Sequence, residues 1–155
     1  MKRLCAILCF CCTMCALKLS AQPPVPLNNP DYNRPQLFQF LPDTIPVDFN
    51  NLNSLLNYKE ENLVSIELSN NTSFVFQGKL ISVVSKYENR IKSIVIQSTN
   101  YPGARFTFSR VTHEDGLITY TGRIISFLHG DLYNLRKNGE QFILIKKGFY
   151  DVINE

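Results

Sequence analysis

Residues 105–128 read RFTFSRVTHEDGLITYTGRIISFL, two runs rich in β-branched and aromatic residues on either side of the dipeptide Asp115-Gly116. In the first run, Phe106 and Phe108 alternate with polar residues. Successive side chains of a strand point to opposite faces of a sheet, and Asp-Gly suits the positive φ of a tight turn. This stretch therefore predicts a β-hairpin with one buried face.

The same pattern recurs on both sides of this hairpin. Short apolar runs alternate with turn dipeptides, and connections this short join only antiparallel neighbours. We therefore expect an all-β fold, an antiparallel meander that forms a small barrel or a two-layer sandwich. Seven strands are predicted: Leu63–Leu68, Ser73–Ser85, Arg90–Ser98, Arg105–Thr112, Leu117–Leu128, Leu132–Lys137 and Gln141–Lys147.

Glycines mark the predicted turns and bends. Asn138-Gly139 suits a turn with positive φ, Pro102-Gly103 suits a type II turn, and Gly130 provides a tight reversal. Gly78 and Gly122 instead fall inside predicted strands, where glycine commonly accompanies a bulge or a sharp bend.

Two short helices complete the predicted fold. Residues 48–57 have Asp48 as a possible N-cap and place Leu52, Leu55 and Leu56 on one helical face, which we expect to cover the sheet. Residues 149–153 are apolar enough for a short terminal helix. The strand before them, Gln141–Lys147, is apolar on both faces and is predicted to be central or covered on both sides.

A proline-rich leader precedes the β-rich domain. Residues 22–46 hold seven of the eight prolines, which disfavours helix and central strand and predicts an extended conformation. Residues 47–155 are predicted to form a single domain. Four apolar residues of the leader are expected to dock on that domain: Leu37, Phe38, Phe40 and Leu41.

Residues 1–21 have the organisation of a cleavable secretory signal peptide. Lys2 and Arg3 form a positive start, residues 4–17 are uncharged and shorter than the roughly 20 residues that span a bilayer, and Ala21 provides the small residue before the cleavage site. Cleavage between Ala21 and Gln22 is predicted. The protein is then exported, periplasmic or secreted, and is not an integral membrane protein after cleavage.

All the cysteines lie in this signal segment, so the exported chain is expected to contain none. That excludes disulfides, cysteine-ligated zinc and thiol nucleophiles. A lipoprotein acylated on one cysteine is the alternative, although neither Cys12 nor Cys15 follows a small residue of the lipoprotein pattern. The five cysteines are Cys5, Cys9, Cys11, Cys12 and Cys15.

Cleavage also removes the excess of positive charge. The whole chain carries a net charge of +3, and loss of Lys2, Arg3 and Lys18 leaves 13 basic against 13 acidic residues. The uniform basicity of a nucleic-acid-binding protein is therefore absent, and no nucleic-acid partner is expected. The remaining charge is uneven, at −4 over residues 22–71 and +6 over residues 72–147. This is typical of solvated strand faces, or of a basic face for an anionic ligand.

Catalytic and metal-binding signals are weak. The only histidines, His113 and His129, fall in turns at opposite ends of one predicted strand, about 30 to 40 Å apart at about 3.3 Å per residue. They are weak candidates for metal ligands and are not expected to share one site. Serine-hydrolase and zinc-protease motifs are absent, so no cofactor or metal is expected and a non-enzymatic role is favoured.

The leading hypothesis is an exported, non-catalytic binding or accessory module for a protein, glycan or envelope component. Its contacts are expected on a sheet face or at Arg105, Arg110 and Arg123, which are the candidate binding residues. The alternative is a small-ligand carrier or hydrolase on a β-barrel. Its cavity would lie among Phe74, Phe76, Phe106, Phe108 and Tyr120.

Overall fold

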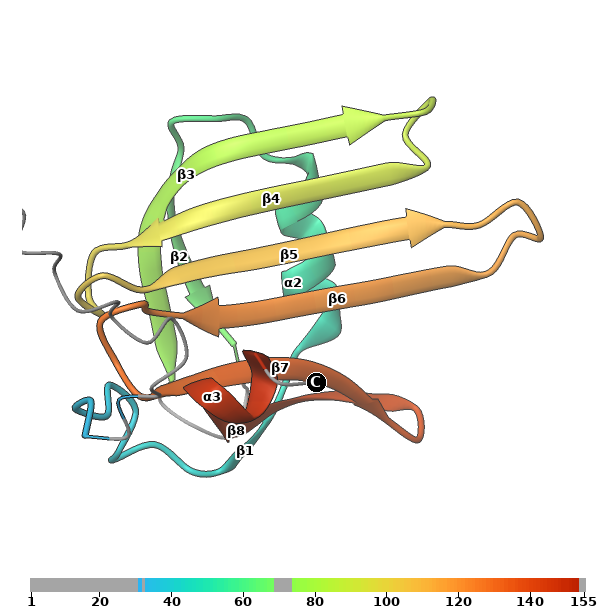
Figure 1. Ribbon diagram of the computed structural model, residues 1–155. Coiled ribbons are helices and arrows are strands. Elements are labelled where there is room, and N and C mark those ends of the chain that lie inside the picture. The colour runs from blue at the N-terminus through green and yellow to red at the C-terminus, as the bar shows by residue number, and fades with distance from the viewer. Residues whose placement is uncertain (1–30, 32, 69–73, 154–155) are drawn as a thin grey trace, which may run out of the picture. The chain divides into compact units, whose positions relative to one another are not determined.

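The computed structural model describes residues 31, 33–68 and 74–153 (Figure 1). The predicted signal peptide, its cleavage site at Ala21 and Gln22, and the five cysteines lie outside these residues, as does the predicted start of a strand at Ser73.

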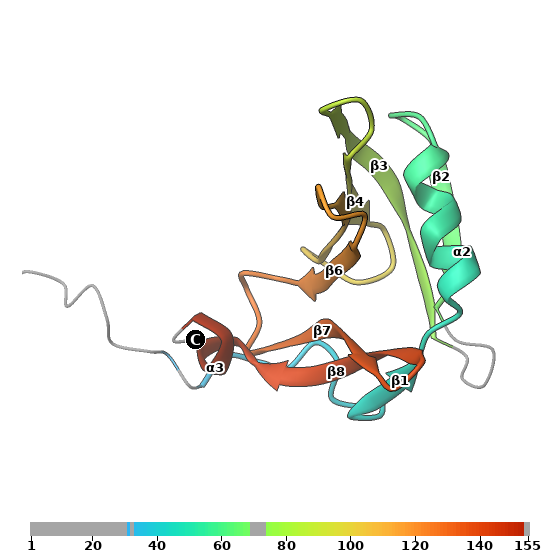
Figure 2. The same cartoon turned by 90° about the vertical axis from the view of Figure 1, so that its right-hand side faces the viewer.

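One antiparallel sheet of eight strands runs through the described residues, in the order β1-β8-β7-β6-β5-β4-β3-β2. From β2 to β8 each strand pairs with the next along the chain, which confirms the predicted all-β meander. The sheet curls into a half-barrel whose two edge strands do not pair with each other (Figures 1 and 2). The strands are β1 (Thr44–Pro46), β2 (Leu63–Glu67), β3 (Val75–Lys86), β4 (Ile91–Ser98), β5 (Arg105–Thr112), β6 (Ile118–Ile125), β7 (Asp131–Asn138) and β8 (Gln141–Gly148).

The alternation of residues 105–112 sets the two faces of the sheet. Phe106 and Phe108 are fully buried, and their partners on β4, Ile96 and Ile94, are buried with them. We call this buried side the concave face and the opposite side the convex face. The predicted turn conformations are also present, because the glycines at 103, 116 and 139 all have positive φ.

A short helical segment covers part of the concave face. Helix α2 (Phe49–Ser54) continues as the 3₁₀ helix η2 (Leu55–Asn57), close to the predicted range. Asp48 caps its start, because its Oδ1 accepts hydrogen bonds from the backbone N–H groups of Asn50 and Asn51 at 3.0 and 3.3 Å. The predicted leucine stripe is buried in the core: Leu52, Leu55 and Leu56. The second helix, α3 (Phe149–Ile153), follows β8 directly.

One strand was not predicted from the sequence. β1 lies in the proline-rich segment and pairs with β8, with Ile45 opposite Leu144. The pairing bonds run from the Lys146 N–H to the Asp43 carbonyl oxygen (2.8 Å) and from the Val47 N–H to the Phe142 carbonyl oxygen (3.0 Å). Pro46 therefore faces the open edge, where its missing N–H costs no ladder bond. As predicted, β8 lies inside the sheet, between β1 and β7.

Both mid-strand glycines lie where the sheet bends. The β3–β4 register shifts between Leu80 and Ser82, two residues after Gly78, and β3 curves there (Figure 1). β6 pairs with β7 only from Arg123 to Ile125, so the two strands part at Gly122 and residues 118–122 of β6 have no partner on β7. β7 and β8 then turn away from the sheet formed by β3–β6 (Figure 2).

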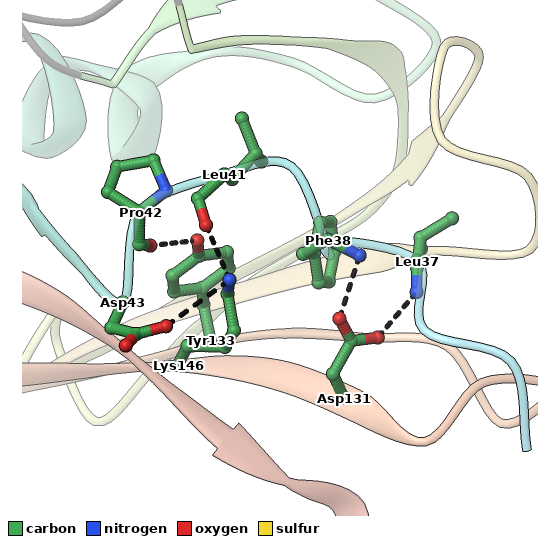
Figure 3. Close-up of polar contacts among 8 residues, drawn as sticks. All are labelled: Leu37, Phe38, Leu41, Pro42, Asp43, Asp131, Tyr133 and Lys146. Carbon is green, nitrogen blue, oxygen red and sulfur yellow. Dashed lines mark hydrogen bonds and ion pairs between the residues drawn. The ribbon is translucent and has the colours of Figure 1, made fainter. Parts of the chain in front are cut away.

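The leader from residue 33 onward packs against β7 and β8 (Figure 3). The carboxylate of Asp131 accepts hydrogen bonds from the backbone N–H groups of Leu37 (2.6 Å) and Phe38 (2.7 Å). Lys146 Nζ donates to the Leu41 carbonyl oxygen and lies 3.4 Å from an oxygen of Asp43. These polar contacts fix the path of the leader across the sheet.

Apolar contacts accompany these bonds. Phe38 is fully buried, with its ring centroid 5.1 Å from that of Tyr133 and 5.5 Å from that of Tyr101. Leu37 and Leu41 are partly buried against the same core. Phe40 differs from the docking expectation, because its side chain is 91% exposed. Phe38 is therefore the main apolar anchor of the leader.

Candidate functional site

The structure places the three candidate arginines on two different faces. Arg105 occupies an odd position of β5, on the convex face, and Arg123 is opposite Thr107 on that same face. Arg110 occupies an even position with Phe106 and Phe108 and so belongs to the concave face. Only Arg105 and Arg123 can act together.

Both convex-face guanidinium groups are held by amide side chains. Arg123 Nε donates to Asn134 Oδ1 at 2.8 Å, and Arg105 Nε donates to Gln97 Oε1 at 2.9 Å. Asn134 is buried, so it fixes the Arg123 side chain against a rigid part of β7. Within the described residues neither arginine forms an ion pair, and the positive charge of each remains available to a ligand.

Arg123 lines a hollow on the convex face, which we call the convex groove. Its volume is about 420 Å³. The groove offers two threonine hydroxyls, one guanidinium, one aliphatic side chain and one aromatic ring. Its lining residues are Thr107, Thr121, Gly122, Arg123, Ile125 and Phe127.

The turn between β6 and β7 presents the aromatic ring of this groove. Phe127 is 65% exposed and its neighbour Leu128 is 70% exposed, although the Phe127 ring also contacts Phe149 edge-on at a centroid distance of 6.0 Å. The turn is closed by Ser126, whose hydroxyl lies 2.8 Å from His129 Nδ1. Two adjacent, exposed apolar side chains on a hydrogen-bonded turn are typical of a contact surface.

His129 is thus a turn residue, and so is His113. His113 Nε2 lies 3.0 Å from the hydroxyl of Thr119, and its carbonyl oxygen accepts the Gly116 N–H at 3.1 Å. The two histidines stand at opposite ends of β6. Within residues 31, 33–68 and 74–153, no group of three His, Asp or Glu side chains could hold a metal ion.

The Ser126–His129 contact was not foreseen from the sequence, and it resembles half of a catalytic pair. Ser126 is, however, fully buried. A serine nucleophile must reach its substrate, and this hydroxyl already accepts the Leu128 N–H at 3.4 Å. The pair therefore stabilises the turn that carries Phe127 and Leu128.

Arg110 has a different environment on the concave face. It lies between Lys92 and Tyr120 on the neighbouring strands. Its Nη2 donates to the Asn89 carbonyl oxygen at 3.4 Å, whereas its Nε is buried without a partner among the described residues. No hollow described here is lined by Arg110, so it does not contribute to the convex groove.

Aromatic rings fill the interior of the half-barrel, where the carrier or hydrolase hypothesis requires a ligand cavity. Phe74, Phe76, Phe106 and Phe108 are buried to 1% exposure or less. The ring centroids of Phe76 and Phe106 are 5.8 Å apart, and those of Phe108 and Tyr120 are 6.0 Å apart. These rings pack against one another rather than around an open space.

No family model, curated protein or solved structure matches this chain. Among the described residues, no helix has both the length and the apolar character needed to cross a membrane. The functional interpretation therefore rests on the geometry of the convex groove.

Proposed function

We propose that this protein is an exported, non-catalytic binding module whose convex groove binds a glycan with acidic groups. The observation that supports this most directly is the side chain of Arg123. Its Nε is fixed by the buried Asn134, its charge has no carboxylate partner among the described residues, and it lines a groove of about 420 Å³. A positioned guanidinium binds a carboxylate or sulfate with two parallel hydrogen bonds.

The other lining groups suit a saccharide. The hydroxyls of Thr107 and Thr121 can donate to and accept from sugar hydroxyls. The exposed ring of Phe127 offers an apolar surface on which the C–H face of a sugar can pack. Arg105, beside Ile125 at the end of the groove, adds a second positive charge.

Export is the second part of the proposal. It is supported by the positive start, the apolar run and the small residue Ala21 of the first 21 residues. The compartment would be the periplasm or the extracellular space, and a lipid anchor on a signal-segment cysteine is the alternative. An acidic glycan would be accessible in either compartment.

The small-ligand carrier or hydrolase receives less support. It requires an open apolar cavity with a polar anchor inside the barrel. Packed rings occupy that interior, and Ser126, which lies close to His129, has a buried hydroxyl. These observations favour binding at the surface over binding in the core.

A glycan array tests the proposal. The protein expressed from the full-length sequence should bind acidic saccharides and not their neutral counterparts. Arg123→Gln should weaken this binding at least tenfold, because a charge-assisted hydrogen bond contributes about 1.5–3 kcal/mol. Arg90→Gln is the matched control, since Arg90 pairs with Glu114 at 3.7 Å, away from the groove.

The Arg90→Gln control should bind acidic saccharides as tightly as the wild type does. Equal binding of neutral and acidic saccharides, or unchanged binding by Arg123→Gln, would contradict the proposed site. Retention of a protein partner with no glycan bound would favour the protein-binding form of the hypothesis instead.

A further inference from the structure

The two edges of the sheet differ in their free hydrogen-bonding groups. On β1, the bonds made by Asp43 and Val47 to β8 leave Thr44 and Pro46 facing outward. Pro46 has no N–H, so this short edge offers a single backbone donor. Short strands and proline are common protections against the addition of another strand. The β1 edge is closed in this sense.

Among the described residues, no strand or backbone hydrogen bond occupies the outer edge of β2. The Leu68 N–H donates to the Phe74 carbonyl oxygen at 3.2 Å, and the Leu80 N–H donates to the Asn62 carbonyl oxygen at 2.9 Å. These bonds place the even-numbered positions of β2 toward β3, because bonded positions alternate along an antiparallel strand. The backbone N–H and C=O groups of three residues therefore point to the free edge: Leu63, Ser65 and Glu67.

A hollow of about 330 Å³ runs along this edge. All five residues of β2 line this hollow. Successive side chains of a strand point to opposite faces of the sheet, so a hollow on one face would be lined by every second residue. The hollow therefore follows the edge of the strand. Its other wall is formed by α2, η2 and the residue after them, and Figure 2 shows α2 beside β2. The residues of that wall are Asn51, Ser54, Leu55 and Tyr58.

The two ends of this hollow differ in chemistry. Tyr58 and Leu63 are exposed apolar side chains at one end. Glu67 lies at the other end and is the only one of the described lining residues with a charged side chain. Residues directly opposite each other on paired strands contact one another on the same face. An added strand would therefore place an apolar residue opposite Leu63 and a basic residue opposite Glu67.

We propose that the β2 edge binds an extended segment of a partner protein as an additional antiparallel strand. The segment has a basic residue followed four positions later by an apolar residue, the order that antiparallel pairing with Glu67 and Leu63 requires. Backbone hydrogen bonds to residues 63, 65 and 67 provide the binding, and the two side-chain contacts provide the selectivity. This site is separate from the convex groove, which lies on β5 and β6.

A second copy of this chain fits the edge less well. Antiparallel pairing of β2 with itself about Ser65 places Glu67 opposite Leu63 at both ends, and neither carboxylate gains a cationic partner. Pairing about Leu63 would place Lys59 opposite Glu67, but Lys59 lies outside β2, before a turn in which Glu61 has a φ of 71°. Charge complementarity therefore favours a basic segment from another protein.

A phage-displayed library of random nine-residue peptides tests the proposal with the protein expressed from the full-length sequence. Selected peptides should share the basic and apolar residues at the stated spacing. Ser65→Pro should reduce binding of a selected peptide at least tenfold, because it removes an outward N–H and leaves the bonds to β3 in place. Ser65→Ala keeps that N–H and should bind like the wild type.

Two further measurements test the proposal without the Ser65→Pro variant, which could fail to fold. Glu67→Lys should change the selected residue from basic to acidic. A selected peptide methylated on the backbone nitrogens that face β2 should lose at least tenfold in affinity. Selection of no common pattern, equal binding to the Ser65→Pro and Ser65→Ala variants, or self-association through β2 in sedimentation would each overturn the proposal.

Discussion

Asp131 is the residue that joins the leader to the sheet. Its buried carboxylate accepts two backbone N–H groups, from Leu37 and Phe38, and hydrogen bonds to a charged acceptor are stronger than neutral ones. The next residue of β7 on this face, Tyr133, donates its hydroxyl to the Pro42 carbonyl oxygen. Two side chains of one strand thus hold both ends of residues 37–42 (Figure 3).

The Tyr133 phenol makes stability depend on pH in the alkaline range. Burial raises the pKa of Tyr133 well above its usual 10.0, and the carboxylates of Asp131 and Asp43 raise it further. The unfolded chain ionises this phenol near pH 10 while the folded protein keeps the proton. The stabilisation is therefore complete below pH 10 and is lost as the pH rises above it.

Tyr133→Phe removes this titration, so its urea unfolding midpoint should fall less than that of the wild type between pH 8 and pH 11. Part of the fall should remain, because burial also raises the pKa of Tyr101. Tyr87→Phe is the control at an exposed tyrosine and should follow the wild type. An equal fall for both variants would show that Tyr133 is not responsible.

Odd and even positions along the strand already predict which candidate arginines share a face of the sheet. Arg105 and Arg110 are five positions apart on one strand, an odd spacing that places them on opposite faces. The contact between Arg123 and Asn134 could not be predicted from odd and even positions. The sequence does not show that β6 and β7 pair over only three residues before they part. The convex groove is lined by residues of β5 and β6 and by Phe127 of the turn after β6, and the sequence does not show that these side chains meet.

At the scale of elements, β1 is a strand that its own sequence does not predict. Residues 44–46 lie among prolines that argue against a strand, and only their pairing with β8 makes them one. The indirect signal was in β8, whose apolar residues on both faces indicated a central or covered strand and not an exposed edge. The meander from β3 to β8 was predictable because no connection in it is longer than six residues.

The close packing of β3 on β4 gives a prediction at this scale. A Cβ added to Gly78 would lie 2.4 Å from the Gln97 carbonyl oxygen and 2.6 Å from a methyl carbon of Ile96. Gly78→Ala should therefore force the strands apart and lower the free energy of unfolding by about 1–3 kcal/mol in urea denaturation. Gln77→Ala changes the neighbouring exposed side chain and should stay within about 0.5 kcal/mol. Equal stability of the two variants would contradict the close approach.

At the scale of the whole molecule, the leader and the sheet share one hydrophobic core. Phe38 of the leader belongs to the same buried cluster as Phe76 of β3 and Leu144 of β8. This was foreseen only as docking of apolar leader residues, since no sequence pattern identifies which phenylalanine is buried. The difference between Phe38 and Phe40 comes from the path set by Asp131 and Tyr133.

Alanine variants of the two leader phenylalanines, one buried and one exposed, test whether the leader contributes to this shared core. Phe38→Ala should lower the free energy of unfolding by about 3–5 kcal/mol, because it leaves a cavity beside the rings of Tyr101 and Tyr133. Phe40→Ala should change it by less than about 0.5 kcal/mol, since that ring is 91% exposed. Thermal or urea unfolding measures both. A leader that contributes nothing to the core would give two variants of equal stability.

The most direct test of the proposed function is a titration of the ¹⁵N-labelled protein with the acidic saccharide that binds best on the array, followed by NMR chemical shifts. We predict saturable shifts at the residues of the convex groove, with β2 unaffected, and at least tenfold weaker binding by Arg123→Gln. Shifts that avoid residues 107, 121–123, 125 and 127, or an unchanged affinity of Arg123→Gln, would contradict the assignment of this groove as the binding site.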